Sequence, residues 1–243
     1  MPIVHKCDQG SELWFTKRLG IPTASCFHKV LTTKKLEPSA QRYDYMALLL
    51  AEWALGRPCE VFAGNRATEH GEELEPIACK VYEFEREVEA RTVGFITTDD
   101  GMIGASPDRL IGEDGLLELK CPFSAAVHMC YMMSRNVDEE YMCQLQGQLF
   151  VSRRSWVDIQ SYFPGLPSVI IRVEPIERYQ LAMGKHLPQF VYELLEMRAE
   201  LTRQYGDFRQ RKPPAQPDPL GLSEEDLEVI LQGRKEARAV DTQ

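Results

Sequence analysis

Residues 102–120 read MIGASPDRLIGEDGLLELK, and this stretch decides the fold. Two runs with the composition of strands, residues 102–111 and 116–120, flank a Gly-Glu-Asp-Gly turn. A third such run, residues 88–97, precedes them and is separated by an Asp-Asp-Gly turn. Because short turns of this type join neighbouring antiparallel strands, the three runs predict an antiparallel meander.

Helical patterns flank this meander on both sides. Apolar spacings of three and four residues predict helices, and two later apolar runs predict strands. Pro76 lies inside one expected helix and predicts a kink or a break there. The expected helices are residues 11–18, 24–31, 39–55, 66–84, 124–134, 139–151 and 175–205, and the later strands are residues 156–163 and 169–173. This order predicts an α/β domain with a mixed central β-sheet flanked by helices.

The chain of 243 residues is long enough for one large domain and short for two. Residues 209–219 hold four prolines, which is typical of a semi-rigid linker. Behind them, Ser223 begins a helical pattern with acidic residues first and basic residues last, as the helix dipole favours. We therefore expect a single domain over residues 1–208, a linker over 209–222 and a helical appendage over 223–243.

The charge of the chain is unevenly distributed. The whole chain carries 28 basic and 37 acidic side chains, a formal net charge of −9, and residues 61–140 alone hold 7 basic and 17 acidic ones. A solvated acidic face explains such a cluster, and so does a site that gathers oxygens around a hard cation such as Mg²⁺. The acidic total argues against a general nucleic-acid coat protein, but it allows a nuclease whose positive potential is local.

Several classes of protein are excluded by what the chain lacks. Its seven cysteines are scattered, so neither a disulfide framework nor a zinc knuckle is predicted. No glycine-rich phosphate loop is present, which argues against a nucleotide-driven helicase or a dinucleotide oxidoreductase. Without a long apolar run or a secretory pattern in residues 1–10, we expect a cytoplasmic protein with no membrane partner.

Glu118 and Lys120 stand two residues apart on the last strand of the meander, so both side chains point to one face while Leu119 points to the other. Pairing with the preceding strand brings Asp108 near Glu118. Because two close carboxylates repel unless a cation lies between them, these two with the backbone oxygen of Leu119 predict a divalent metal site. Lys120 is placed to act on water that attacks a phosphodiester. An exposed Glu–Lys surface pair is the alternative interpretation.

The motif Ser106-Pro107-Asp108, followed by Leu-Glu-Leu-Lys-Cys-Pro-Phe at residues 117–123, resembles the active-site signature of the phage lambda-type alkaline exonucleases. These form the YqaJ-like viral recombinase branch of the PD-(D/E)xK nuclease superfamily. Three more segments resemble motifs of the family in the same order: residues 17–25, 71–78 and 141–146. The resemblance implies a restriction-endonuclease-like core. No counterpart is found beyond about residue 205.

The resemblance implies a role for each matching residue. Asp108 and Glu118, with Leu119, bind metal, and Lys120 serves the nucleophilic water. Glu75 adds an outer or second-metal carboxylate. The residues implied to face DNA are Arg18, Ser25 and Ser106 around the 5′-terminal phosphate, Gln144 at the edge of the site, and Lys34 and Lys35 in the segment that helps to part the duplex.

Some of these roles have simpler alternatives. Arg18 also suits a surface ion pair, Ser25 a helix-capping hydroxyl, and Glu75 a solvated acid. The family bears basic residues after its Thr-Ala-Ser segment, and here the pattern leaves open whether Lys34 or Lys35 takes that part. For Asp108, Glu118 and Lys120 the agreement of motif and spacing favours the catalytic interpretation.

The implied function is a 5′→3′ exonuclease on double-stranded DNA that releases mononucleotides and leaves 3′ single-strand overhangs for recombination. The implied cofactor is Mg²⁺, with Mn²⁺ as a substitute and two ions per site. The implied partners are DNA ends, copies of the same chain in a ring-shaped trimer, and a single-strand annealing protein. A structure-specific or site-specific endonuclease of the same fold and a non-catalytic scaffold that binds DNA ends are the alternatives.

Overall fold

The computed structural model describes residues 1–59 and 66–207. The chain divides into two compact units, Met1–Gly206 and Asp207–Gln243, and the described residues belong to the first apart from Asp207. The linker and the helical appendage expected over residues 209–243 therefore lie outside the described residues.

The secondary structure follows most of the expected ranges. The helices are α1 (Glu12–Arg18), the 3₁₀-helix η1 (Ala24–Lys29), α2 (Arg42–Leu55), α3 (Arg66–Arg86), α4 (Ala125–Ser134), α5 (Glu139–Ser152) and α6 (Glu177–Tyr205). The strands are β1 (Ile3–His5), β2 (Ala90–Thr92), β3 (Phe95–Thr97), β4 (Gly104–Ala105), β5 (Arg109–Ile111), β6 (Gly115–Lys120), β7 (Trp156–Ser161) and β8 (Val169–Val173). Helix α3 continues across Pro76, so the chain is not broken there.

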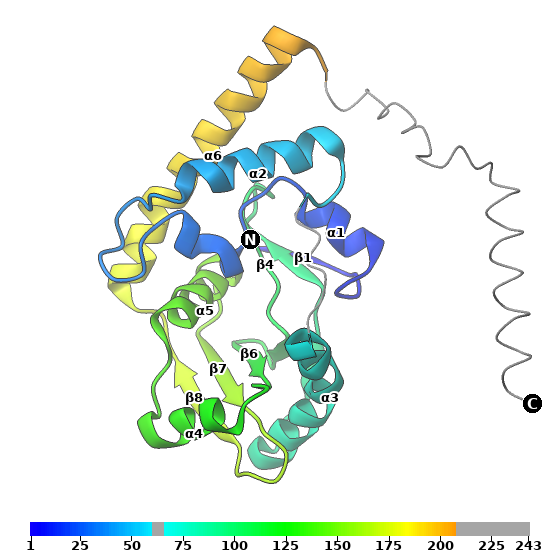
Figure 1. Cartoon of the computed structure of the whole chain (residues 1–243), viewed down its shortest axis with the longest axis vertical. Helices are drawn as coiled ribbons and strands as arrows, with labels where there is room; N and C mark the ends of the chain where they lie inside the picture. The colour runs from blue at the N-terminus through cyan, green and yellow to red at the C-terminus, as the bar shows by residue number, and fades with distance from the viewer. Residues whose placement is uncertain (60–65, 208–243) are drawn as a thin grey trace, which may run out of the picture. The chain divides into compact units, whose positions relative to one another are not determined.

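The strands form two sheets. The larger sheet has the order β2-β5-β6-β7-β8 and is mixed, because β6 and β7 run parallel while the other neighbours run antiparallel. The crossover that parallel neighbours require is made by α4 and α5. Figure 1 shows β6 to β8 between α3 on one side and α4 and α5 on the other. The predicted α/β fold with a mixed sheet and flanking helices is confirmed.

The smaller sheet has the order β1-β3-β4, and it arises because two expected strands are divided. Residues 88–97 and 102–111 were each expected as one strand, which is wrong. Pro107 has no N–H and interrupts the second expected strand. As a result, β3 pairs with β1 on one side and with β4 on the other, whereas β2 pairs with β5 in the larger sheet. A Cβ atom on Gly94 would lie 2.1 Å from the backbone oxygen of Cys7, so the N-terminal segment packs directly onto the bend.

Strand β6 separates two hydrophobic clusters. Leu116 belongs to the larger one, to which α5, η1 and α6 contribute, whereas Leu117 and Leu119 belong to a smaller one beside α3. Because side chains alternate along a strand, Glu118 and Lys120 share the face of Leu116. The predicted alternation is confirmed.

The short helix η1 packs closely against α5. A Cβ atom on Gly147 would lie 2.5 Å from the ring of Phe27, so this approach requires glycine. The helix expected over residues 24–31 is therefore a shorter 3₁₀-helix. Thr23 occupies its N-cap position without a side-chain capping hydrogen bond. The contact carries Ser25 toward the glutamine-bearing face of α5.

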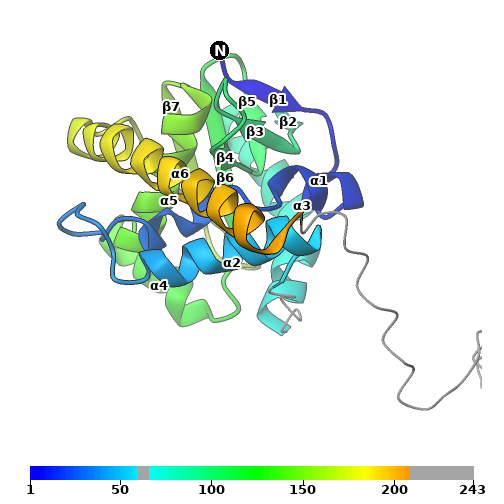
Figure 2. The same cartoon turned by 90° about the horizontal axis from the view of Figure 1, so that it is seen from above.

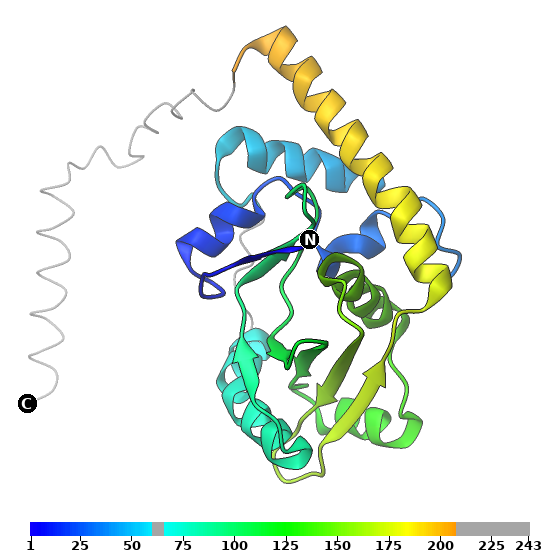
Figure 3. The same ribbon diagram turned by 180° about the vertical axis from the view of Figure 1, so that it is seen from behind.

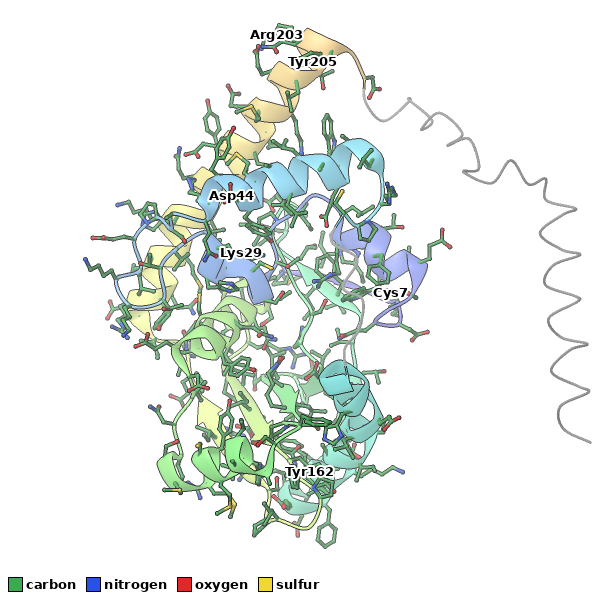
Figure 4. All side chains as sticks on the ribbon, viewed as in Figure 1. Cys7, Lys29, Asp44, Tyr162, Arg203 and Tyr205 are labelled. Atoms are coloured by element: carbon green, nitrogen blue, oxygen red, sulfur yellow. The ribbon has the colours of Figure 1, made fainter. Side chains whose placement is uncertain are left out.

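Helices α2 and α6 form a layer that crosses the sheets, as Figures 2 and 3 show. Arg42 pairs with Glu193 at 2.9 Å, and the rings of Tyr45 and Phe190 stack 5.8 Å apart. Arg198 of α6 also donates a hydrogen bond to the backbone oxygen of Gly20, just after α1. Figure 4 places Asp44 of α2 and Tyr162, which follows β7, toward opposite ends of the described unit.

Asp158 is fully buried on β7, where it accepts hydrogen bonds from Tyr82 at 2.8 Å and from two nitrogens of Arg172 at 2.8 and 2.9 Å. Asp158→Ala leaves the buried Tyr82 hydroxyl without its acceptor, whereas Arg172, whose side chain is 46% exposed, can turn to solvent, so we expect the free energy of unfolding in urea to fall by about 1–3 kcal/mol. Arg91→Ala removes an exposed pair with Glu113 and is the control, with an expected loss below about 0.5 kcal/mol. Equal stability of the two variants would contradict this structural role.

The structure adds two observations on the cysteines and the helices. All seven cysteines are free thiols. Within residues 1–59 and 66–207, no helix combines the length and the apolar character that crossing a membrane requires.

Candidate active site

The candidate site lies where β6 extends beyond its neighbour β5. Pairing between the two strands reaches Arg109 and Leu117, where β5 begins, and Pro107, two residues earlier, has no N–H with which to extend it. Asp108 continues the contact instead: its N–H donates to the oxygen of Leu117 at 3.1 Å, and its Oδ2 accepts from the N–H of Leu119 at 2.6 Å. Because the N–H and C=O of one strand residue point to the same edge, the oxygen of Leu119 also faces Asp108.

The Glu118 carboxylate is held by three donors. Its Oε1 accepts from Lys120 Nζ at 2.6 Å and from Gln144 Nε2 at 2.7 Å, and its Oε2 accepts from Gln148 Nε2 at 2.7 Å. Glu118 is only 3% exposed, and the ammonium group of Lys120 also lies over the ring of Tyr141 at 4.8 Å. A buried charge needs such compensation, so the orientation of this carboxylate is tightly determined.

The site is electrostatically unusual. Burial raises the pKa of Asp108 well above its ordinary value, and the charges of Glu118 and Glu75 raise it further. Burial alone disfavours charged Lys120, but the carboxylates of Glu118 and Asp108 outweigh it, so the pKa of Lys120 is raised. Glu118 and Asp108 thus both act on one ammonium group while Glu75 adds its charge beside Asp108, and the excess of acidic groups favours binding of a cation.

Arg18 ends α1 and donates to Ser106 Oγ at 2.8 Å. Trp14, one turn earlier, donates to the same oxygen at 3.1 Å, and its ring lies 4.1 Å from the guanidinium carbon of Arg18. Burial lowers the pKa of Arg18 from its high ordinary value. The guanidinium is therefore oriented by packing beside the Ser-Pro-Asp motif, where a planar donor fork suits a phosphate.

A cavity of about 180 Å³ joins these groups. It is lined by Gln9, Trp14, Arg18, Ala24, Ser25, Ser106, Asp108, Glu118, Gln144 and Gln148. The structure thus brings together, around one space, the expected phosphate-facing residues of three separate segments and the two expected metal-binding carboxylates.

Glu75 lies on α3, and its charge reaches Asp108, whose pKa it helps to raise. It lines a second cavity, of about 610 Å³, beside the N-terminal segment. Gln9 lines both cavities and donates from Nε2 to the backbone oxygens of Val93 and Pro107, each at 2.9 Å. This arrangement favours a position for Glu75 at the outer side of the site.

Lys34 and Lys35 occupy an exposed loop after η1. Lys34 Nζ lies 3.8 Å from a carboxylate oxygen of Glu139 at the start of α5. Neither lysine is among the described residues that line the 180 Å³ cavity. The structure therefore leaves these two residues outside the cluster.

Three contributors were missed by sequence reasoning. Gln148 stands four residues after Gln144, so the helical period alone places both on one face, and that signal was available. Trp14 stands four residues before Arg18 and offers the same signal. Gln9 had none, because its position depends on the bend at Gly94 and Pro107.

The residues present fit a hard divalent cation. The described part of the chain holds no cluster of three or more His, Cys, Asp or Glu side chains arranged for a metal ion. Mg²⁺, however, retains several waters and is bound through one or two carboxylates. Asp108, Glu118 and the oxygen of Leu119 offer oxygen donors of this kind, and the raised pKa of Asp108 shows that its charge lacks full compensation.

Solved structures share this fold. An alkaline exonuclease from Laribacter hongkongensis, LHK-Exo, is 33% identical, with a TM-score of 0.71 over 80% of this chain and 97% of that one. The same enzyme in complex with dAMP matches at 32% identity, also with a TM-score of 0.71 and the same coverage. A phage-related exonuclease from Haemophilus somnus 129PT, at 13% identity with a TM-score of 0.59 over 74% of this chain and 96% of that one, shows the fold alone. No curated protein sequence matches.

The fold is thus that of the alkaline exonucleases. The family model for the YqaJ-like viral recombinase domain matches residues 13–155, which include the whole candidate site except Gln9. The chain belongs to the YqaJ-like viral recombinase family.

Proposed function

We propose that the chain is a metal-dependent 5′→3′ exonuclease that degrades one strand of double-stranded DNA to mononucleotides and leaves 3′ overhangs. The observation that carries this proposal is the single cavity lined by both Arg18 with Ser106 and Asp108 with Glu118. A terminal phosphate bound by the first pair lies beside the carboxylates of the second. This neighbourhood suits cleavage close to a DNA end.

In this proposal Asp108, Glu118 and the oxygen of Leu119 hold the metal, and Glu75 serves as the outer or second-metal carboxylate. The proposed cofactor is Mg²⁺, with Mn²⁺ as a substitute and two ions per site. When bound, the ions would supply positive charge beside the scissile phosphate. Lys120, charged because its pKa is raised, orients the attacking water and stabilises the negative charge that develops on phosphorus. Gln144 holds Glu118 at the edge of the site.

The end of the strand is bound by Arg18, Ser25 and Ser106. Arg18→Ala should lower kcat/KM on 5′-phosphorylated duplex by about 10–100-fold, because a charge-assisted hydrogen bond contributes about 1.5–3 kcal/mol. On duplex with a 5′-hydroxyl end, kcat/KM of the same variant should fall by less than about threefold. Lys17→Ala, the neighbouring cation on α1, is the control. Equal losses on both substrates would contradict a role at the phosphate.

The first experiment follows linear duplex DNA labelled at the 5′ or the 3′ end, with Mg²⁺ and with EDTA. Early release of the 5′ label as mononucleotide, and no release in EDTA, supports the proposal. A covalently closed circular duplex in parallel separates the alternatives. Cutting of the circle favours an endonuclease of the same fold, and binding of ends without cutting favours a scaffold.

The proposal extends to the assembly that performs the reaction. A homotrimeric ring around the duplex would keep the enzyme on DNA without strong chemical affinity, which suits the net charge of −9. Lys34 and Lys35, exposed beside α5, are then placed to contact the duplex rather than the reacting bond. A single-strand annealing protein in the cytoplasm of the same bacterial cell is the proposed recipient of the 3′ strand.

A further inference from the structure

Gln148 is a polar residue of α5 that the proposed mechanism does not use. Its side chain is fully buried, and its Nε2 donates to Glu118 Oε2 at 2.7 Å. Lys120 and Gln144 both donate to the other oxygen, Oε1. Gln148 therefore holds the one carboxylate oxygen that those two residues do not reach.

The orientation of the Gln148 amide is dictated by this contact. A carboxylate accepts and never donates when ionised, so the NH₂ group must face Glu118 and the amide oxygen must point elsewhere. That oxygen, Oε1, is buried and has no hydrogen-bond partner among the described residues. Buried acceptors are nearly always satisfied, so an exception needs an explanation, and the contact of this amide with Glu118 supplies one.

Gln148 also adjoins the other residues of the candidate site. Gln148 lines the 180 Å³ space together with Asp108 and Glu118. We propose that Gln148 is a positioning residue that orients the Glu118 carboxylate for metal binding. This inference rests on the proposed function in one respect, since it takes Glu118 as a metal ligand.

Gln146 offers a matched control on the same helix. It is also fully buried, but it faces away from the site: its Nε2 donates to the oxygen of Glu174 at 2.8 Å, and its Oε1 accepts from the N–H of Ile176 at 2.8 Å. Exchange of either glutamine for methionine removes one buried amide from α5. Only the exchange at residue 148 alters the support of Glu118.

The test is calorimetric titration of the full chain with MnCl₂ in the absence of DNA. Gln148→Met should weaken Mn²⁺ binding by about 10–100-fold, the usual effect of losing a group that orients a metal ligand. Gln146→Met should change it by less than about threefold. Unchanged affinity in Gln148→Met, or equal weakening in both variants, would overturn the inference.

Two further arms keep the result interpretable. If Gln148→Met does not fold, Gln148→Asn, which keeps the amide but withdraws it from Glu118 by one methylene, is judged by the same criterion. Nuclease assays on the same preparations separate this inference from the proposed function. If the parent chain cleaves DNA and Gln148→Met binds Mn²⁺ as tightly as the parent does, only the inference is refuted. If Gln148→Met weakens Mn²⁺ binding but the parent chain does not cleave DNA, only the proposed function is refuted.

Discussion

Lys120→Ala should lower the rate of DNA hydrolysis by about 10³-fold or more while leaving DNA binding nearly unchanged. Loss of a positioned proton donor or of a cation that stabilises transition-state charge typically reduces the rate by about 10²–10⁴-fold. The ammonium group lies 2.6 Å from Glu118 on the open edge of β6, so it adjoins the proposed metal ligands. It is one of 28 basic side chains, and its loss changes the overall affinity for DNA little.

Single-turnover hydrolysis of a 5′-labelled duplex measures the rate, and fluorescence anisotropy in EDTA measures binding. Lys185→Ala, on the exposed side of α6, is the matched control and should retain the parent rate. Lys120→Arg keeps the charge but replaces the compact ammonium by a planar guanidinium, so its rate separates the effect of charge from that of the position of the donor. Normal turnover in Lys120→Ala would rule out the assignment of the site.

The part of the site on β6 could be predicted because its signals are local. Side chains alternate between the two faces of a strand, so Glu118 and Lys120 share one face. The apolar residues fix that alternation, because Leu116 packs in one cluster of buried residues and Leu117 and Leu119 pack in the other. A short turn then determines which residue of the previous strand arrives opposite. Such information lies within twenty residues of sequence.

The division of the meander into two sheets could not be predicted in the same way. It depends on Pro107 and on the packing of Cys7 against Gly94, a contact between segments far apart in the chain. β1 is only three residues long and pairs with β3 at residues 95–97, far away in the sequence. No local sequence pattern therefore predicts this strand. The same long-range contacts position Gln9, which is why it was missed.

The form of η1 was also decided by tertiary packing. The spacing of residues 24–31 suits an α-helix, but Phe27 inserts against Gly147 of α5, and the segment closes as a 3₁₀-helix ending at Lys29. Since Ser25 lies on this segment, its entry into the cavity could be inferred only from the family resemblance. Physical pattern and resemblance were therefore complementary: the first predicted that the carboxylates lie together, and the second indicated the residues that are proposed to face the phosphate.

Asp108→Asn should abolish hydrolysis and at the same time stabilise the metal-free chain. The amide keeps an oxygen that can accept the 2.6 Å hydrogen bond from Leu119, but it removes a charge that burial and the carboxylates of Glu118 and Glu75 disfavour, as the raised pKa of Asp108 indicates. We expect a gain on the order of 1 kcal/mol in EDTA, or about 2–4 °C in Tm for a chain of this size.

Metal should reverse this order of stability. A ligand at a hundred times its Kd stabilises the folded state by about 2.7 kcal/mol, so Mg²⁺ should raise the Tm of the parent chain by about 5–10 °C. Asp108→Asn should show almost no such rise, because one of the two carboxylates that are proposed to bind the ion is gone. Thermal unfolding of both chains with Mg²⁺ and with EDTA measures the effect, and an equal rise in both would exclude Asp108 as a metal ligand. We therefore expect Asp108→Asn to be more stable than the parent chain in EDTA and less stable in Mg²⁺, because the negative charge of the site destabilises the folded state until a cation is bound.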